Sequence, residues 1–289
     1  MAAFLLAACI IPAGTIHITR TGAVATKPIL QPIAPSEGYP RTEIVLALDL
    51  SSSLCDDGVG PCTSGVKLDA LKAAARDMID LGILQPDSEM PLFGRIGIVP
   101  ASGRVRFALD GDTTNTVVPL TTDKALLHTQ IRQMIAGGAS TSNFGIDWAW
   151  RVLSPKWNVL WPEALSPGPF SKLTSQRKRW PPPPLRKIVV LATDGKFASS
   201  QIGAGDAGET SKSDIKQLCA GIKSMNIEIF TVGIEFNRLN AAERKIATET
   251  LENCATRSSD HYNATTHDAV KAAFRDIVMK LWPSPPISG

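Results

Sequence analysis

Three oxygen-bearing side chains follow a short apolar run at a spacing that suits metal binding. Residues 43–48 read EIVLAL, and Asp49, Ser51 and Ser53 come directly after them. Such a run predicts a buried strand, and ligands of open α/β sheets bind beyond the carboxyl ends of the strands. One carboxylate and two hydroxyls suit a hard cation such as Mg²⁺, which keeps positions open for water or a ligand. The alternative is that these residues only cap the next helix.

Two later segments place further oxygen atoms at comparable positions. Residues 186–192 form a second apolar run, and Asp194 lies just beyond its end in the sequence TDG. A double glycine at 137–138 precedes three hydroxyl residues at 140–142, where a helix is expected to begin. The acidic residue therefore repeats the arrangement seen at Asp49, at the end of another predicted strand.

The elements that position these residues alternate between strand and helix. This alternation predicts a mostly parallel sheet covered by helices on both faces. The segment 104–109 is expected to form a hairpin with the strand before it, at the sheet edge. We expect strands at 43–48, 95–100, 104–109, 186–192, 227–233 and 261–262. Helices are expected at 66–81, 123–135, 212–224, 241–252 and 268–281, and a further helix begins somewhere in 137–150 and ends at 153.

Composition excludes several classes of function. The chain has 289 residues, enough for one well-cored domain, and its net charge of +3 is scattered, which argues against nucleic-acid binding. Neither a GxSxG, nor a P-loop, nor a GxGxxG followed by an acid occurs, and the four histidines lie far in sequence from the polar loops. We therefore expect no enzyme, although Asp49 as a metal ligand or nucleophile in hydrolysis remains an alternative.

Four of the five cysteines fall into pairs. Cys55 and Cys62 lie in one Gly/Asp/Pro-rich loop, and Cys219 and Cys254 flank a predicted strand and helix. Two disulfides would place the domain in an oxidising compartment. The alternative for the second pair is two buried free thiols.

The N-terminal residues differ from the rest. Residues 1–20 are hydrophobic, with Arg20 as the first charge, and are short for a membrane-spanning helix. We interpret them as the distal part of a membrane anchor that begins before Met1. Acylation of Cys9 in a lipobox-like LAAC and a buried, β-rich N-terminus are the alternatives. Residues 21–41 are predicted to be a linker, 42–283 the domain and 284–289 a tail.

A Trp/Pro-rich insertion at 155–184 follows the third helix, in which Trp148, Trp150 and Leu153 predict a large buried face. Because it follows a helix, it should lie at the sheet edge opposite the polar loops. Its residues Trp157, Trp161 and Trp180 either form a contact surface or fold back on the domain. The loop from Cys55 to Cys62 should instead border the polar loops, with Asp56 and Asp57 either near the ion or serving as solvated turn acids.

The motifs DLSSS, GGASTS and TDG, in this order, resemble the metal-ion-dependent adhesion site of von Willebrand factor type A domains over residues 41–282. The resemblance implies a Rossmann-like α/β fold with a mostly parallel central sheet and an antiparallel edge strand. It implies that Mg²⁺, Mn²⁺ or Ca²⁺ is bound by Asp49, Ser51, Ser53, Ser140 and Asp194. The serine at 140 replaces the family's threonine, and Thr141 is the alternative ligand.

Four stretches are more narrowly similar to the TadE/TadG-like proteins of bacterial tight-adherence (Flp) pilus assembly: GRIGIVPAS, DWAWRVLSP, the LC…GIKSMNIEIFTVGI run and LENCATRSSDHYNA. This resemblance implies an inner-membrane anchor, a domain in the periplasm or outside the cell, and a cysteine pair at 219 and 254. The function it implies is metal-dependent capture of an acidic residue on a pilus or envelope protein. The alternatives are a disulfide-braced scaffold with a vestigial metal site and, less favoured, a hydrolase.

Overall fold

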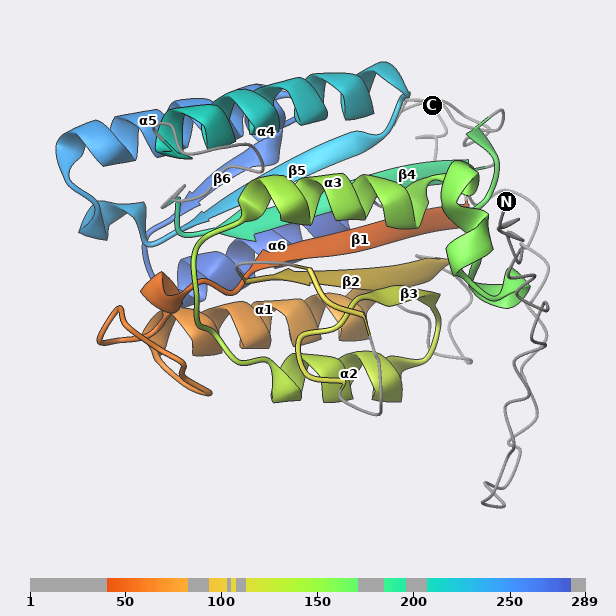
Figure 1. Ribbon diagram of the computed structural model, residues 1–289, viewed down its shortest axis with the longest axis horizontal. Helices are drawn as coiled ribbons and strands as arrows, with labels where there is room; N and C mark the ends of the chain where they lie inside the picture. Colours follow the sequence, from red (N-terminus) through yellow and green to blue (C-terminus); the bar gives the residue numbers. More distant parts are fainter. Residues whose placement is uncertain are drawn as a thin grey trace, which may run out of the picture. The chain divides into compact units, whose positions relative to one another are not determined.

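The computed structural model describes residues 41–82, 94–102, 105–107, 113–170, 185–195 and 207–281. Within them one six-stranded sheet has the order β3-β2-β1-β4-β5-β6 (Figure 1). Neighbouring strands are parallel except for β3, which runs antiparallel to β2. The predicted fold class is therefore confirmed. The strands are β1 (Arg41–Asp49), β2 (Arg95–Ala101), β3 (Val118–Thr121), β4 (Leu185–Thr193), β5 (Glu228–Ile234) and β6 (His261–Ala264).

Six α-helices within the described ranges cover the two faces of the sheet (Figure 1). Alternate residues of β1 point to opposite layers, as the period of a strand requires. Leu46 and Leu48 join a core with α1, α2 and α6, while Val45 and Ala47 join a second core with α3, α4 and α5. The helices are α1 (Val66–Gly82), α2 (Lys124–Gln133), α3 (Ser142–Leu153), α4 (Ala207–Ser224), α5 (Ala241–Cys254) and α6 (His267–Leu281).

The antiparallel edge strand lies later in the chain than predicted. β2 pairs with β3, with Ile96 opposite Thr121 and Ile98 opposite Val118. Of the predicted strand 104–109 the structure describes residues 105–107, and Phe107 packs against the core on the α3 side. The hairpin prediction was wrong because alternating apolar residues show that one face of a segment is buried without selecting its partner.

The first half of the Trp/Pro insertion is held at the amino edge of the sheet. Glu43, fully buried on β1, accepts hydrogen bonds from Arg95 at 2.6 Å and from the backbone N–H of Gly168 at 2.9 Å, and it pairs with Lys187 at 2.9 Å. Burial raises the pKa of Glu43, but the Lys187 and Arg95 charges together hold it below its usual value. Arg95 also donates to the carbonyl of Ser166 at 2.7 Å. The insertion therefore begins at the edge opposite Asp49, as predicted.

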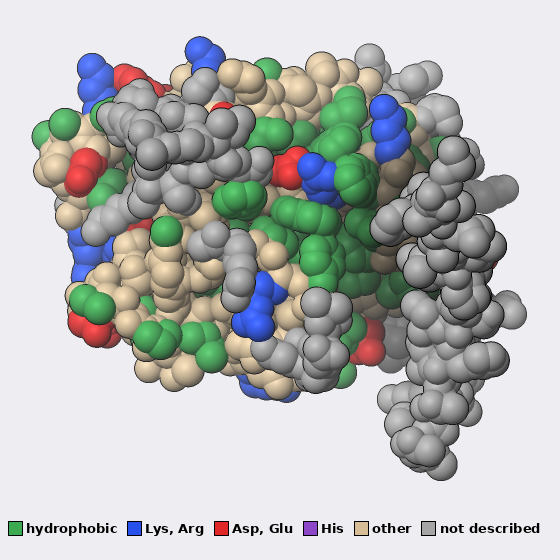
Figure 2. Space-filling view, viewed as in Figure 1, with side chains coloured by type: hydrophobic (Ala, Val, Ile, Leu, Met, Phe, Trp, Pro, Cys, Tyr) green, Lys and Arg blue, Asp and Glu red, His purple; other side chains and the backbone are tan. Residues whose placement is uncertain are grey.

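The described aromatic residues of this region pack against one another and against α3, and each stays partly exposed. The Phe107 ring lies 4.7 Å from that of Trp148 and 6.2 Å from that of Trp161, and the Arg151 guanidinium lies 4.1 Å over the Trp157 ring. Figure 2 shows apolar side chains gathered over α3 and the segment that follows it. Leu153 is fully buried, whereas Trp148 and Trp150 are only half-buried, so the predicted buried face is narrower. Trp180 lies outside the described residues.

Both predicted disulfides are present. Cys219 on α4 is joined to Cys254 at the end of α5, and Cys55 is joined to Cys62 in the loop after β1. Since disulfides persist in oxidising compartments, they indicate a location outside the cytoplasm. None of the helices in the described ranges is long and apolar enough to cross a membrane. The predicted anchor at 1–20, the linker up to residue 40 and the tail at 284–289 lie outside the described residues.

Candidate metal centre

The candidate centre begins where β1 ends. Asp49 is 1% exposed, and its Oδ1 accepts a hydrogen bond of 2.9 Å from the backbone N–H of Ser51. The chain then turns through a short 3-10 helix, Ser52–Leu54, which brings the hydroxyl oxygens of Ser51 and Ser53 to 3.0 Å from each other. The first loop therefore presents one carboxylate and two adjacent hydroxyls at the carboxyl edge of the sheet.

Backbone hydrogen bonds fix the second loop beside the first. Cys62 and Ala136 exchange two backbone hydrogen bonds of 2.8 and 2.9 Å, so the disulfide loop is attached to the segment that leads to Ser140. Ser52 also donates to the carbonyl of Gly138 at 2.9 Å. Because these bonds involve only the main chain, the relative position of the two loops depends little on the side chains that occupy the centre.

Three hydroxyls converge on the other carboxylate oxygen of Asp49. Its Oδ2 accepts hydrogen bonds from Ser140 at 2.7 Å, from Thr193 at 2.7 Å and from Ser142 at 3.1 Å. Ser142 and Thr193 were not among the predicted site residues. Their positions in the sequence could have identified them, because each lies one or two residues from a predicted ligand, at the start of α3 or the end of β4.

Of the two candidates in the second loop, Ser140 contacts Asp49. Thr141 is fully buried as well, but its hydroxyl finds no hydrogen-bond partner among the described residues. The structure thus brings Ser140, not Thr141, to the carboxylate. The serine presents the same hydroxyl oxygen as a threonine would, without the methyl group that restricts the rotamer.

Asp194 pairs with a lysine that sequence reasoning did not identify. Its Oδ2 lies 2.9 Å from the Nζ of Lys67, and both side chains are largely excluded from solvent. The same ammonium donates to the backbone carbonyl of Ser53 at 3.0 Å. Lys67 therefore links the third loop to the first. A lysine in the first turn of a helix carries no local signal of such a role, because its partner is 127 residues away in sequence.

The two carboxylates of the centre lie close enough to influence each other. Burial raises the pKa of Asp49, the charge of Asp194 raises it further, and hydrogen bonds from Thr193, Ser140 and Ser51 oppose these effects without cancelling them. Among the described residues, Lys67 places its ammonium 2.9 Å from Asp194 and offsets part of the negative charge of this centre. Two acids buried together favour a nearby cation.

The donor set fits a small divalent cation. An octahedral Mg²⁺ with bonds of about 2.0–2.1 Å spaces adjacent ligand oxygens by about 2.9 Å, close to the 3.0 Å between the hydroxyls of Ser51 and Ser53. The hydroxyl of Ser140 gives its proton to Asp49 and retains lone pairs for a metal. Across the described residues, no three His, Cys, Asp or Glu side chains form a group that could hold a metal. The hydroxyl oxygens of Ser51, Ser53 and Ser140 lie at this edge beside Asp49.

The acids of the disulfide loop serve as turn and helix-capping groups. The carboxylate of Asp56 accepts from the backbone N–H of Val66, the first residue of α1, at 2.8 Å. That of Asp57 accepts from Val59 at 2.9 Å and from Gly60 at 3.3 Å, and these bonds lower the pKa of Asp57. The structure thus favours the interpretation of both residues as turn acids.

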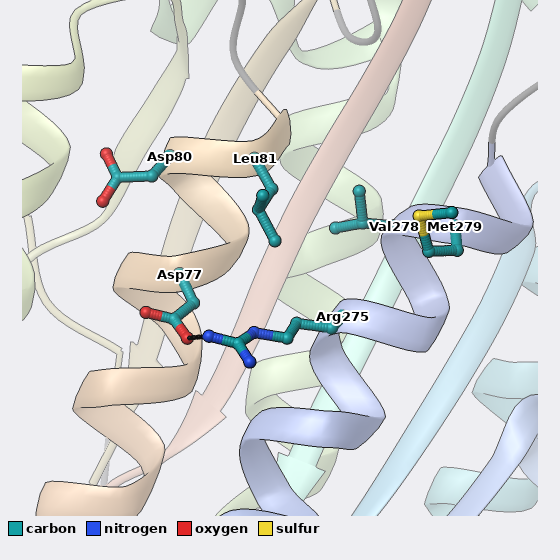
Figure 3. A pocket seen from close by; sticks show the side chains of 6 residues that line it. All are labelled: Asp77, Asp80, Leu81, Arg275, Val278 and Met279. Carbon is teal, nitrogen blue, oxygen red and sulfur yellow. Dashed lines mark hydrogen bonds and ion pairs between the residues drawn. The ribbon is translucent and has the colours of Figure 1, made fainter.

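A separate hollow lies between α1 and α6 (Figure 3). It is spanned by an ion pair of 2.8 Å between Asp77 and Arg275, and Leu81 and Met279 supply exposed apolar surface. Lys67 lies in the first turn of the same helix α1, about 15 Å along the helix axis from Asp77 at 1.5 Å per residue. This hollow is therefore distinct from the candidate centre.

Comparisons with known proteins identify the fold. No known protein family matches the chain by sequence, and no curated protein is similar to it. The pilus adhesin SpaC from Lactobacillus rhamnosus GG, in its open conformation, is similar at a TM-score of 0.55 and 11% identity, over 85% of this chain and 30% of SpaC. The PilB minor pilin from Streptococcus sanguinis is similar at 0.52 and 14% identity, over 89% of this chain and 65% of PilB.

A structure described as von Willebrand factor type A from Catenulispora acidiphila aligns at a TM-score of 0.42 and 15% identity, over 84% of this chain and 42% of that one. The chain spans less than two thirds of SpaC and of PilB. At these identities the likeness to SpaC and PilB concerns the fold alone. The narrower resemblance to the TadE/TadG-like family has no support from a sequence match. What the chain shares with SpaC and PilB is a Rossmann-like α/β architecture.

Proposed function

We propose that this chain is a metal-dependent protein-binding domain that captures an acidic side chain of a partner through a divalent cation. The observation that carries the proposal is the convergence of Ser140 and Thr193 on the buried carboxylate of Asp49, beside a second buried carboxylate, that of Asp194. The site lies at the carboxyl edge of the sheet, where ligands of such folds bind. Ser53 is the partly exposed member of the set, and we propose that a partner reaches the cation from its side.

Each residue of the centre has a distinct part in this proposal. Asp49 supplies charge, and Ser51, Ser53 and Ser140 supply neutral oxygens, so the cation would remain under-neutralised. Asp194 adds a second carboxylate, directly or through water. The cation, when bound, supplies strong coordination to an incoming carboxylate. Thr193 and Ser142 hold Asp49 in place by hydrogen bonds.

The setting that we propose is the bacterial envelope, with the domain anchored in the inner membrane by residues 1–20 and active in tight-adherence pilus assembly. The two disulfides support an oxidising compartment. The proteins of similar fold are named a pilus adhesin and a minor pilin, which supports adhesion rather than catalysis. The partner would be a pilus or envelope protein that offers an exposed acidic residue.

The test is calorimetric titration of Mg²⁺ and Mn²⁺ into the full chain. We expect saturable binding in the wild-type protein, none in Asp49→Ala, and wild-type affinity in the control Asp268→Ala, which removes an exposed acid on α6. Capture of an acidic partner should then cease in excess chelator. Binding that survives Asp49→Ala, or partner capture that persists in chelator, contradicts the proposal.

One observation favours a second candidate, a disulfide-braced scaffold with a vestigial site. The ion pair of Asp194 with Lys67 already satisfies part of the charge that a metal would neutralise. If the folded wild-type chain binds neither metal, the scaffold function is the better explanation. The aromatic cluster around Trp148 and Trp157 would then be the next surface to test for contacts.

A further inference from the structure

The ammonium of Lys67 is built into the candidate centre. Lys67 is only 8% exposed, and its Nζ lies 2.9 Å from the Oδ2 of Asp194 and 3.0 Å from the carbonyl oxygen of Ser53. Both contacts are to residues of the predicted metal set. A buried lysine is rarely found without a partner of opposite charge, and here that partner is a carboxylate assigned to the metal.

The start of α1 is fixed at several points, which holds Lys67 over the sheet edge. The backbone N–H of Val66 donates to Asp56 at 2.8 Å, and the N–H of Gly65 donates to the carboxylate of Asp69 at 3.2 Å. The disulfide between Cys55 and Cys62 closes the loop that precedes the helix. Because the backbone on both sides of Lys67 is tied down, its side chain reaches Asp194 without reorganisation of the helix.

We propose that Lys67 is a tethered cation that competes with the divalent ion for Asp194. This inference rests on the proposed function and adds the means by which the site sets its affinity. The ammonium offsets one unit of negative charge at the two carboxylates, and the site without it would be more negative by that unit. A divalent ion is attracted more strongly to the more negative site, and the effect is large because the groups are buried.

The competition has a structural benefit for the metal-free protein. Asp49 and Asp194 are each only 1% exposed, and carboxylates buried in one centre need a counter-charge, which Lys67 supplies when no ion is bound. Binding of the metal then releases the ammonium from Asp194. The site would therefore fill only at metal concentrations that overcome Lys67, and its affinity is lower than its ligand set allows.

A matched control is available on the same helix. Lys72 is also 8% exposed, but its Nζ donates to the backbone carbonyls of Thr63 at 2.8 Å and of Arg132 at 3.5 Å, and the structure gives it no ion pair with a carboxylate of the centre. Lys72→Met therefore removes an equally buried ammonium outside the metal site. Lys67→Gln removes the charge of Lys67 and keeps a hydrogen-bond donor for Asp194, which protects the fold.

The experiment titrates Mg²⁺ into the full-length wild-type, Lys67→Gln, Lys67→Arg and Lys72→Met proteins by calorimetry, and follows thermal unfolding with and without chelator. We expect Lys67→Gln to lower the Kd for Mg²⁺ roughly tenfold, within the 5–150-fold range of coupled sites. Lys67→Arg and Lys72→Met should keep the wild-type Kd. In chelator Lys67→Gln should unfold at a lower temperature than the wild type, and saturating Mg²⁺ should close that gap.

The outcomes separate this inference from the proposed function. Equal Kd values for the wild type and Lys67→Gln overturn the competition and leave the metal site standing. Binding by Lys67→Gln but not by the wild type supports the competition and shows that the native chain does not use a metal. Absence of binding in both overturns both. If Lys67→Gln does not fold, NMR of reductively ¹³C-methylated wild-type protein decides, because Mg²⁺ must then shift the Lys67 resonance and leave that of Lys72 unchanged.

Discussion

Replacing Thr193 by valine tests whether this residue holds Asp49 in position. Thr193 is fully buried at the end of β4, and its hydroxyl makes three hydrogen bonds. It donates to Asp49 at 2.7 Å, and it accepts from the backbone N–H of Gly195 at 3.1 Å and from the Ser142 hydroxyl at 3.2 Å. Valine has nearly the same shape, so the substitution removes these bonds without opening a cavity.

The expected loss is about 2–4 kcal/mol in the free energy of unfolding. A hydrogen bond to an ionised group contributes about 1.5–3 kcal/mol and one between neutral groups about 0.5–1.5 kcal/mol. Ser142 also donates to Asp49 at 3.1 Å, so it keeps a partner, whereas the N–H of Gly195 loses its side-chain acceptor. The control Thr193→Ser keeps the hydroxyl and loses one methyl group, about 0.8 kcal/mol.

The pH dependence of the loss follows from Asp49. Burial and the charge of Asp194 raise its pKa, and the hydrogen bond from Thr193 is one of the contacts that lower it. A carboxyl whose pKa is raised by folding contributes most to stability below its unfolded pKa, and that contribution is lost as the pH rises through the folded pKa. Thr193→Val raises the pKa of Asp49 further, so its cost should be larger at neutral pH than near pH 4.

The assay is urea unfolding in chelator, followed by circular dichroism across this pH range. We expect Thr193→Val to be less stable than Thr193→Ser by more than 1 kcal/mol at pH 7, with the difference shrinking as the pH falls. A valine variant as stable as the serine variant, or a difference independent of pH, would refute the assignment of Thr193 as the residue that positions Asp49.

Two further predictions concern the opposite half of the sheet. Replacing Cys219 and Cys254 together by serine removes a disulfide between residues 35 apart in the sequence. This change should lower the free energy of unfolding by about 4 kcal/mol. A urea midpoint equal to that of the oxidised wild type would contradict this prediction. Burial lowers the pKa of His261, so thermal stability should decline as the pH falls below about 6.5. His261→Asn should remove that decline, and equal slopes for both proteins would disprove it.

The sequence was sufficient for elements whose own side chains report their surroundings. The short apolar run before Asp49, with its β-branched residues and flanking turn residues, predicted a strand buried on both faces, because such a run has no polar side for solvent. The helices at 66–81 and 241–252 were predictable in the same way, because their apolar residues recur at helical spacing. The order of strands and helices then put Asp49 and Asp194 at one sheet edge, and the cysteine pairs agreed with that order.

The edge strand and the aromatic cluster required the tertiary structure. The segments 104–109 and 118–121 both contain apolar residues, as expected of a segment with one buried face. Only the packing beside β2 decides which of the two segments pairs with that strand. Trp148 and Trp150 lie on α3 at a spacing that suits burial, yet both stay half-buried because the face of α3 that packs on the sheet is filled by smaller residues such as Ala149 and Val152.

The local pattern of the sequence by itself determined which side chains are apolar, which strands are buried and which loops carry oxygen atoms. It did not determine which of those atoms meet. Ser140 and Thr193 lie 91 and 144 residues from Asp49, and Lys67 lies 127 residues from Asp194. Contacts over such separations depend on how β1 and β4 pair and where α1 begins, and only the packed sheet fixes these positions.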